Sequence, residues 1–233
     1  MLNELIKEIN FLANKDKAEI YKGFFKMGEG EYGESDIFLG LTIPQQRALA
    51  KKNVNLSFQK IQELLKNKIH EYRLIGLLIL VEKYQKANDR DKEEIFSFYL
   101  KNLKYVNNWD LVDLTADKIV GDFLFNKNKK ILYEMVHSKI LWEKRIAVIS
   151  TFYFIKKEEF KDAFAIFELL LQDKHDLIHK SIGWMLREIG KRDEKELEIF
   201  LKFHYKKMPR TMLRYAIEKF EEEKRKKYLL GNI

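Results

Sequence analysis

The sequence contains no cysteine and only two prolines, and these absences exclude several kinds of protein. Without cysteine the chain has no disulfide, no thiolate nucleophile, no iron-sulfur cluster and no cysteine-based zinc site. A chain without cysteine fits a reducing compartment. No internal stretch is rich in proline, serine or glycine, so we expect one continuous domain over residues 1–233 instead of two linked ones.

Long hydrophobic runs are also absent. The most apolar stretch, RLIGLLILVEKY, is broken by Glu82 and Lys83, well short of the roughly eighteen residues that a membrane span needs. The N-terminal MLNELIKEINFLANKDK is amphipathic and lacks the apolar region and cleavage site of a signal peptide. We therefore expect a soluble, cytoplasmic protein with no membrane partner.

What the chain does have is positive charge and a large apolar fraction. Lysine and arginine number 44 against 36 acidic residues, which gives a formal charge of +8 and a pI near 9.3, and 46% of the residues are hydrophobic. This composition excludes a disordered chain and favours an anionic partner such as nucleic acid or an acidic membrane surface. Charge alone does not choose between these partners.

Nearly all of the chain has helical periodicity. Residues 72–84 are apolar on so wide an arc that this helix must be buried on most sides, whereas residues 93–106 carry a narrower apolar stripe. The β-branched run IAVISTFYF has no turn signal before IKKEEFKDAFAIFELLL, so we expect helix to continue through it. Pro44 and Pro209 each open a helical run, where the missing N–H costs nothing.

A pattern recurs along the chain: a polar residue opens an apolar helix, and a second amphipathic helix follows. The spacings between these openings are 37, 35, 35 and 31 residues, which is typical of two-helix solenoid repeats. The sequence therefore predicts an all-α solenoid of five or six helix pairs. The first four openings would line a mostly basic concave groove able to hold an elongated anion. The openings are Arg73, Asp110, Arg145, Lys180 and Thr211.

Two short motifs match known sites only in part. Gly28, Gly30 and Gly33 spell G-x-G-x-x-G, but no strand precedes them and the glutamates between them would repel phosphate, so we interpret this segment as a connector. His175 and His179 stand one helical turn apart, a spacing that zinc can use, yet a third ligand is not evident. We expect no metal and no cofactor.

The stretch NNWDLVDLTAD, residues 107–117, places acid beside a tryptophan in a basic protein. Asn107 or Asn108 suits a helix N-cap, and Asp110 suits the first turn. At about 100° per residue, Trp109, Val112, Asp113, Ala116 and Val120 share one arc, while Asp110 and Asp117 lie toward the polar side. A carboxylate that borders an apolar arc needs either a basic partner on a neighbouring repeat or a ligand. We consider both roles for Asp113.

These stretches together resemble the AlkD-type DNA glycosylases of the DNA alkylation repair group, which are built from HEAT-like repeats. The specific matches are NNWDLVDLTADKIVGDF, LWEKRIAVI and IGWMLREIGK, and weaker similarity covers nearly the whole chain. The resemblance implies that Asp113 and Trp109 correspond to the catalytic aspartate and its companion tryptophan. It likewise implies that Arg145 contacts phosphate and that Trp184 is the second active-site tryptophan. We further expect DNA contacts from Lys144, Lys180, Arg187 and Arg73.

The resemblance implies excision of N3- and N7-alkylated purines, such as 3-methyladenine and 7-methylguanine, from duplex DNA. A cationic purine leaves readily, so a fixed carboxylate at Asp113 would stabilise the oxocarbenium-like sugar and orient water. No lysine stands out as an amine nucleophile beside it, so we expect a monofunctional enzyme. The sequence leaves the oligomeric state open, and a monomer is the default expectation. One departure affects substrate range: the residues at positions 41–44, Leu, Thr, Ile and Pro, lack a glutamine that some members carry.

Two alternatives remain open at the level of sequence. One is a family member that binds DNA without cleaving it. The other is a HEAT-type protein scaffold, a common use of solenoids. A scaffold gives no reason for Trp109, Asp113, Arg145 and Trp184 to face one groove.

Overall fold

The computed structural model describes residues 1–34 and 36–233 of the chain. These residues divide into two compact units, Met1–Thr115 (unit 1) and Ala116–Ile233 (unit 2). The described residues are almost entirely helical, and their only β-structure is an isolated parallel bridge between Ile37 and Ile69. The expected all-α helical-repeat fold is confirmed. The single domain over residues 1–233 stays a prediction.

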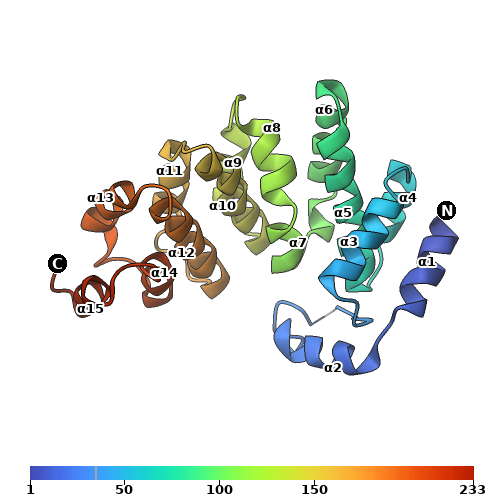
Figure 1. The fold of residues 1–233 in the computed structure, drawn as a ribbon, viewed down its shortest axis with the longest axis horizontal. Helices are drawn as coiled ribbons and strands as arrows, with labels where there is room; N and C mark the ends of the chain where they lie inside the picture. Colours follow the sequence, from blue (N-terminus) through green and yellow to red (C-terminus); the bar gives the residue numbers. More distant parts are fainter. Residues whose placement is uncertain (35) are drawn as a thin grey trace. The chain divides into compact units, whose positions relative to one another are not determined.

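Short connections join most of the helices in both units, and a long one, residues 25–42, joins α2 to α3 in unit 1 (Figure 1). Unit 1 contains α1 (Leu2–Phe11), α2 (Lys15–Phe24), α3 (Ile43–Lys52), α4 (Phe58–Leu65), α5 (His70–Lys86), α6 (Asp89–Lys101), a 3-10 turn (Leu103–Tyr105) and α7 (Trp109–Asp113). Unit 2 contains a π-helical turn (Asp117–Gly121), α8 (Asp122–Leu124), α9 (Lys130–Val136), α10 (Leu141–Lys156), α11 (Lys161–Leu169), α12 (Asp176–Gly190), α13 (Glu194–His204), α14 (Arg210–Ala216) and α15 (Glu222–Leu230).

The core of unit 1 forms around α5, the helix that the apolar pattern of residues 72–84 predicts. Leu74, Ile75 and Leu77 are fully buried, and α5 packs against α3, α4, α6 and the short α7. Because apolar residues occupy nearly its whole circumference, this helix gains its stability from burial on several sides.

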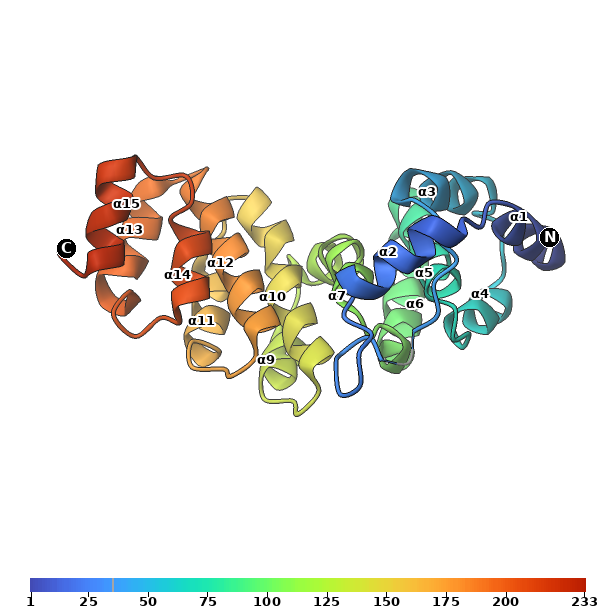
Figure 2. The same cartoon turned by 90° about the horizontal axis from the view of Figure 1, so that it is seen from below.

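In unit 2 the first helices of successive repeats lie side by side: α10 packs against α12, and α12 packs against α14 (Figure 2). Gly183 allows the close approach of α12 to α14, because a Cβ at this position would lie 2.6 Å from the carbonyl oxygen of Met212. All five predicted repeat openings, from Arg73 to Thr211, fall near the start of a helix, in agreement with the predicted repeat register.

Local signals place several helix ends correctly. Pro44 lies in the first turn of α3, and Pro209 directly precedes α14. One expectation is wrong: helix does not continue without a break from the run IAVISTFYF, because α10 ends at Lys156 and Glu158 adopts a left-handed φ of 59° before α11 begins. Among the described residues, no helix is both long and apolar enough to cross a membrane.

Candidate functional site

The short helix α7 carries two of the predicted site residues, Trp109 and Asp113, at its two ends. Asn108 caps the helix, since its side-chain oxygen accepts a hydrogen bond from the Trp109 backbone N–H at 2.8 Å, as the sequence predicts. Both Trp109 and Asp113 are half-buried, and four residues of helix place them about one turn apart on the same side. Unit 1 therefore brings the expected aromatic and carboxylate pair together.

Phenylalanines from α2 and from the residue after it support the Trp109 indole. Phe25 stacks on it with ring centroids 5.2 Å apart and planes 13° apart, and Phe24 meets it edge-on at 5.5 Å. Phe25 is buried, whereas the Phe24 side chain is 62% exposed. Phe25 covers one face of the indole and fixes its orientation, and the exposed ring of Phe24 lies beside it.

The helix that begins at Trp109 is shorter than the sequence predicts, so it does not carry all five residues expected to share one of its sides. The helix ends at Asp113, so Ala116 and Val120 belong to the following helical segment in unit 2. Asp117, which its position on the polar side predicts to be solvated, is instead 1% exposed. It accepts hydrogen bonds from Lys118 and Lys156, each at 2.8 Å. Two lysines compensate this buried charge, which periodicity alone does not reveal.

A buried polar cluster lies against the start of α7, and we call it the His70 cluster. The imidazole of His70 lies between two carboxylates, with Nδ1 2.9 Å from an Asp36 oxygen and Nε2 2.8 Å from an Asp110 oxygen. Asn108 donates a hydrogen bond to Asp36 at 2.9 Å, and the Arg73 guanidinium pairs with the same carboxylate. All five residues are at most 4% exposed: Asp36, His70, Arg73, Asn108 and Asp110.

The charges within this cluster determine its protonation. Burial by itself would lower the pKa of His70, but the charge and hydrogen bond of Asp110, with those of Asp36, raise the pKa of His70 to about 9. Burial would raise the pKa of Asp36, yet the hydrogen bond from His70 and the Arg73 charge bring this pKa below its ordinary value. His70 is accordingly an imidazolium at neutral pH.

Two sequence-based roles change as a result. Arg73 is 4% exposed, and besides Asp36 its guanidinium donates to the carbonyl oxygens of Asn67 and Lys68, both at 3.1 Å. These contacts give Arg73 a structural role inside unit 1 in place of the expected position on an exposed groove. Asp110 likewise does more than favour the helix dipole, because it is buried against His70.

Glu71, which follows His70 in the first turn of α5, holds the loop that leads into residues 41–44, the segment that departs from the family pattern. The Glu71 carboxylate accepts hydrogen bonds from the backbone N–H groups of Leu39, Gly40 and Leu41 at 2.8 to 3.3 Å. Thr42 and Gln45 then form a capping box that starts α3. Residues 41–44 thus build a helix start, with Leu41 buried.

Unit 2 carries the other two predicted catalytic residues. Arg145 is 4% exposed near the start of α10, and its guanidinium donates to the Leu177 carbonyl oxygen. Trp184 of α12 is half-buried, with its ring 5.7 Å from that of Phe152. The Lys156 ammonium lies 4.8 Å from the centroid of Phe152, so a cation and two aromatic rings meet at this place.

The remaining predicted DNA contacts in unit 2 are ion-paired. Lys144 lies 2.6 Å from Asp173, Lys180 lies 2.6 Å from Asp176, and Arg187 pairs with Glu218. A pocket of about 500 Å³ opens beside Lys144, and its lining carries more positive than negative charge. The sequence pattern does not indicate this pocket, whose lining residues are Lys139, Leu141, Lys144, Gln172, Asp173, Lys174 and His175.

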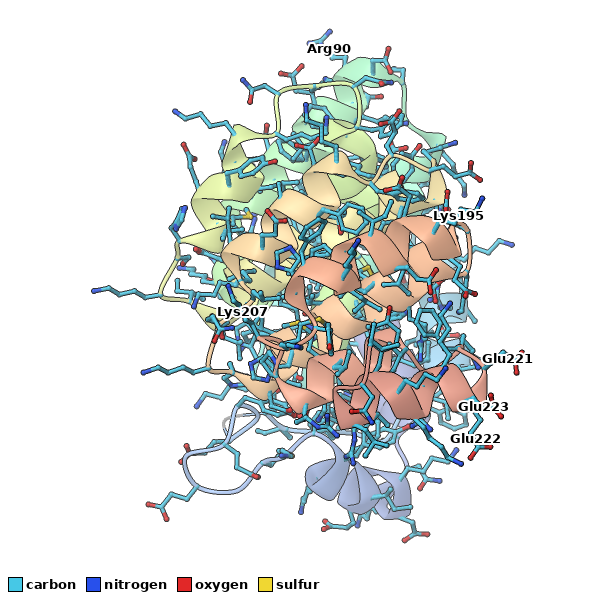
Figure 3. The ribbon with its side chains drawn as sticks, turned by 90° about the vertical axis from the view of Figure 1, so that its left-hand side faces the viewer. Arg90, Lys195, Lys207, Glu221, Glu222 and Glu223 are labelled. Atoms are coloured by element: carbon cyan, nitrogen blue, oxygen red, sulfur yellow. The ribbon has the colours of Figure 1, made fainter. Side chains whose placement is uncertain are left out.

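Other charges of unit 2 simply face solvent. Figure 3 shows Lys195, Lys207 and the acidic run Glu221 to Glu223 pointing outward. The run occupies the N-terminal end of α15, where negative charge favours the helix dipole. These side chains provide matched controls for the charged residues that have a candidate role.

The two ambiguous motifs have local roles. The Gly28 and Gly30 backbone amides bond to the Glu31 and Glu34 carboxylates at 2.9 and 3.0 Å, so the amides that a phosphate would need are already occupied. The segment is a connector, as interpreted. His175 accepts a hydrogen bond from the Leu177 N–H at the start of α12. No group of three or more acidic or histidine side chains in the described part of the chain is arranged for a metal.

A family model and two solved structures relate this chain to DNA alkylation repair proteins. The family model described as "DNA alkylation repair enzyme" matches residues 5–220. A predicted DNA alkylation repair enzyme from Enterococcus faecalis has a similar structure, with a TM-score of 0.70 and 16% identity, over 90% of this chain and 97% of the other. AlkD2 from Streptococcus mutans is similar with a TM-score of 0.59 and 18% identity, over 86% and 99% of the two chains. No curated protein matches in sequence.

Proposed function

Because this chain belongs to the DNA alkylation repair enzyme family, we propose that it is a monofunctional DNA glycosylase that removes N3- and N7-alkylated purines from duplex DNA. The observation that carries this proposal is the pair on α7, in which a half-buried carboxylate stands one turn from a supported indole. Both residues are half-buried, so neither is sealed inside the core of unit 1. Both have the chemistry that a reaction at a deoxyribose requires.

Asp113 has the central role in the proposed reaction. Alkylation at N3 or N7 makes the purine a cationic leaving group, and departure of the base moves positive charge onto the sugar. A fixed carboxylate aimed at the sugar stabilises this transition state more than the ground state. It also accepts a proton from the water that attacks C1′, so the base leaves with the bonding electrons and water replaces it.

Aromatic and basic side chains complete the proposed binding. Trp109 is proposed to present a ring face to the developing sugar cation, worth on the order of 0.5 to 2 kcal/mol by analogy with cation–π contacts. Trp184, in unit 2, is proposed as a second catalytic tryptophan with the same kind of ring face. Arg145, whose guanidinium the Leu177 carbonyl oxygen helps to orient, is proposed to bind a phosphate near the lesion by charge-assisted hydrogen bonds. A DNA duplex is long enough to be held by separate groups on each unit.

Backbone contacts are assigned to the lysines and arginine at the surface of unit 2. Lys144, Lys180 and Arg187 pair with Asp173, Asp176 and Glu218. The Lys180 pair is exposed, and a pair of this kind is weak enough for phosphate to compete; Lys144 and Arg187 are 24% and 20% exposed and are reached by phosphate only at their open side. A basic DNA-binding surface, a monomeric state and association with cellular DNA belong to the same proposal. So does recognition of the sugar and backbone without enclosure of the base, which would allow bulky adducts.

The decisive test is release of 7-methylguanine or 3-methyladenine from methylated duplex DNA. Asp113→Asn is expected to lower the single-turnover rate by about 100-fold or more, since a transition-state charge partner is lost. The matched control is Asp89→Asn, an exposed aspartate in the first turn of α6, which should behave like wild type. Wild-type rates in Asp113→Asn would refute the site.

A DNA-binding protein without catalytic activity is the main alternative. It predicts tight, salt-dependent binding to DNA with no base released by wild type or variant. A protein scaffold predicts weak DNA binding as well. One titration and one release assay therefore separate the three functions.

A further inference from the structure

We propose that His70 is a positioning residue for the site on α7: by bonding Asp36 and Asp110 at once, it fixes the helix that presents Trp109 and Asp113. This inference rests on the proposed function for its catalytic consequence. Its structural consequence, a defined position of α7, does not depend on that function.

The first argument is that α7 cannot hold its own place. It contains five residues, and a helix this short is unstable without tertiary contacts, because nucleation costs more than a single turn returns. Two polar links tie its N-terminal end to the rest of unit 1. Asn108 donates to Asp36 at 2.9 Å, and Asp110 accepts from His70 at 2.8 Å.

The second argument is that both links lead to Asp36. Asn108 bonds Asp36 directly, and Asp110 is connected to Asp36 through the two ring nitrogens of His70. A neutral imidazole has only one N–H, so it can satisfy only one of two flanking carboxylates. A protonated ring donates to both, at 2.9 and 2.8 Å. The cluster then carries two negative and two positive charges: Asp36 and Asp110 balance His70 and Arg73.

The third argument is that His70 also supports the indole through ring contacts. Its imidazole stacks on Phe38 at 4.5 Å, Phe38 stacks on Phe25 at 4.6 Å, and Phe25 stacks on Trp109 at 5.2 Å. A cationic ring beneath aromatic faces strengthens this stack. Both residues of the α7 pair are thus positioned from one buried histidine.

His70→Gln should displace α7 without abolishing the fold of unit 1. The amide can bond only part of what the imidazolium bonds, and Asp110 is left as a buried charge with no cation opposite it. A shift of about 1 Å in a reacting group can cost on the order of 100-fold in rate. We expect the rate of base release to fall by roughly 10- to 100-fold while the Kd for DNA stays within about threefold.

The double variant His70→Gln/Asp110→Asn restores charge balance, because it also removes the uncompensated carboxylate. It should recover most of the lost rate. His137→Gln makes the same substitution at an exposed histidine and is expected to match wild type. Asp110→Asn alone keeps Asp36, His70 and Arg73 together, weakens the link to α7 and leaves one positive charge of the cluster uncompensated. It tests the idea if His70→Gln does not fold.

The closing experiment measures Trp109 fluorescence and single-turnover base release on folded protein. Fluorescence is recorded in a Trp142→Phe/Trp184→Phe background, so that Trp109 is the remaining tryptophan, and release is recorded without those substitutions. Positioning predicts a red-shifted, more quenchable Trp109 in His70→Gln and a lower rate per folded molecule. If His70→Gln and Asp110→Asn both match His137→Gln in these readouts, the proposal is overturned. If wild type releases no base, the glycosylase function fails, and the fluorescence still decides the role of His70.

Discussion

The two units use the polar residue at a repeat opening in opposite ways. In unit 1, Arg73 and Asp110 point inward, are at most 4% exposed, and close a charge-balanced cluster around His70. In unit 2, Lys180 occupies the same repeat position but pairs with Asp176, whose side chain is 53% exposed. Arg145 is intermediate, because it is as buried as the openings of unit 1 and yet donates to the backbone carbonyl of Leu177 in the next repeat.

The comparison shows that repeat position does not determine function. Where a neighbouring loop supplies a buried carboxylate, as Asp36 does, the polar residue at the opening becomes part of a buried ion-pair cluster, the His70 cluster. Where no such carboxylate is near, as for Lys180, the polar residue stays a surface cation. The His70 cluster supports the helix that carries Trp109 and Asp113, whereas the surface cations suit a polyanion. Each difference predicts a different response to substitution.

The largest loss of stability should come from removing a charged member of the His70 cluster. Arg73→Met leaves the buried Asp36 without its guanidinium and is expected to lower the free energy of unfolding by roughly 3 to 5 kcal/mol. Lys180→Met, at the equivalent position of unit 2, removes a partly exposed pair worth about 0 to 1 kcal/mol. Urea unfolding of both variants measures the difference, and similar losses would show that the two openings are not distinct.

A second effect follows from the pKa of His70. A histidine whose pKa rises from 6.5 to about 9 on folding stabilises the native state fully below pH 6.5, and the contribution is lost as pH rises through 9. The expected size is roughly 3 kcal/mol. The facing charged groups are Asp36, Asp110 and Arg73.

The measurement is the free energy of unfolding from about pH 6.5 to 9.5, compared with His70→Gln. The variant should lose the alkaline decrease that wild type shows. In unit 2 the histidine effect runs the other way, because burial lowers the pKa of His175, so its contribution weakens toward acid. An equal alkaline slope in wild type and variant would argue against a charged His70.

A third, smaller effect concerns backbone packing. A Cβ on Gly183 in unit 2 would lie 2.5 Å from the Tyr215 Cβ, whereas a Cβ on Gly76 in unit 1 would come no nearer than 3.2 Å to the Leu65 side chain. Gly183→Ala is expected to cost roughly 1 to 3 kcal/mol through overpacking. Gly76→Ala should be near neutral, since a gain in helix propensity of about 1 kcal/mol offsets the tighter fit. Thermal unfolding of the two variants checks this contrast.

Much of the fold is predictable because its signals are local. Apolar period predicts α5, the two prolines predict the starts of α3 and α14, and recurrence predicts where the repeats open. The pairing of Trp109 with Asp113 is also predictable, since four residues of helix fix it.

The His70 cluster is not predictable by the same reasoning. Asp36 lies in a loop, 34 residues before His70 and 72 residues before Asn108, so no periodicity links the three residues. Period indicates which face of a helix a residue occupies, but it does not indicate whether a distant loop will bury it. For the same reason periodicity wrongly predicts a solvated Asp117, although Lys156 reaches it from 39 residues away.

The smallest effect on stability should accompany a clear effect on DNA binding. Lys144 and Asp173 form a partly exposed pair beside a pocket that also holds Lys139 and Lys174. Lys144→Met is expected to lower the free energy of unfolding by about 1 kcal/mol, because Asp173 loses its cation but keeps the hydrogen bond from the His175 backbone N–H. It should also reduce the slope of log K against log salt by about 1, because one phosphate contact is lost.

Asp173→Asn tests the same site with the opposite sign. The side chain of Asp173 is 9% exposed and neutralises Lys144, and burial opposed by the Lys144 hydrogen bond leaves the pKa of this carboxyl below its ordinary value. Removing its charge frees Lys144 for phosphate, so DNA affinity should rise a few-fold while Lys144→Met lowers it. Lys195→Met, at an outward-pointing lysine of the same unit (Figure 3), is the control. If all three variants bind DNA alike across salt concentrations, the lysines at the start of α10 do not contact DNA.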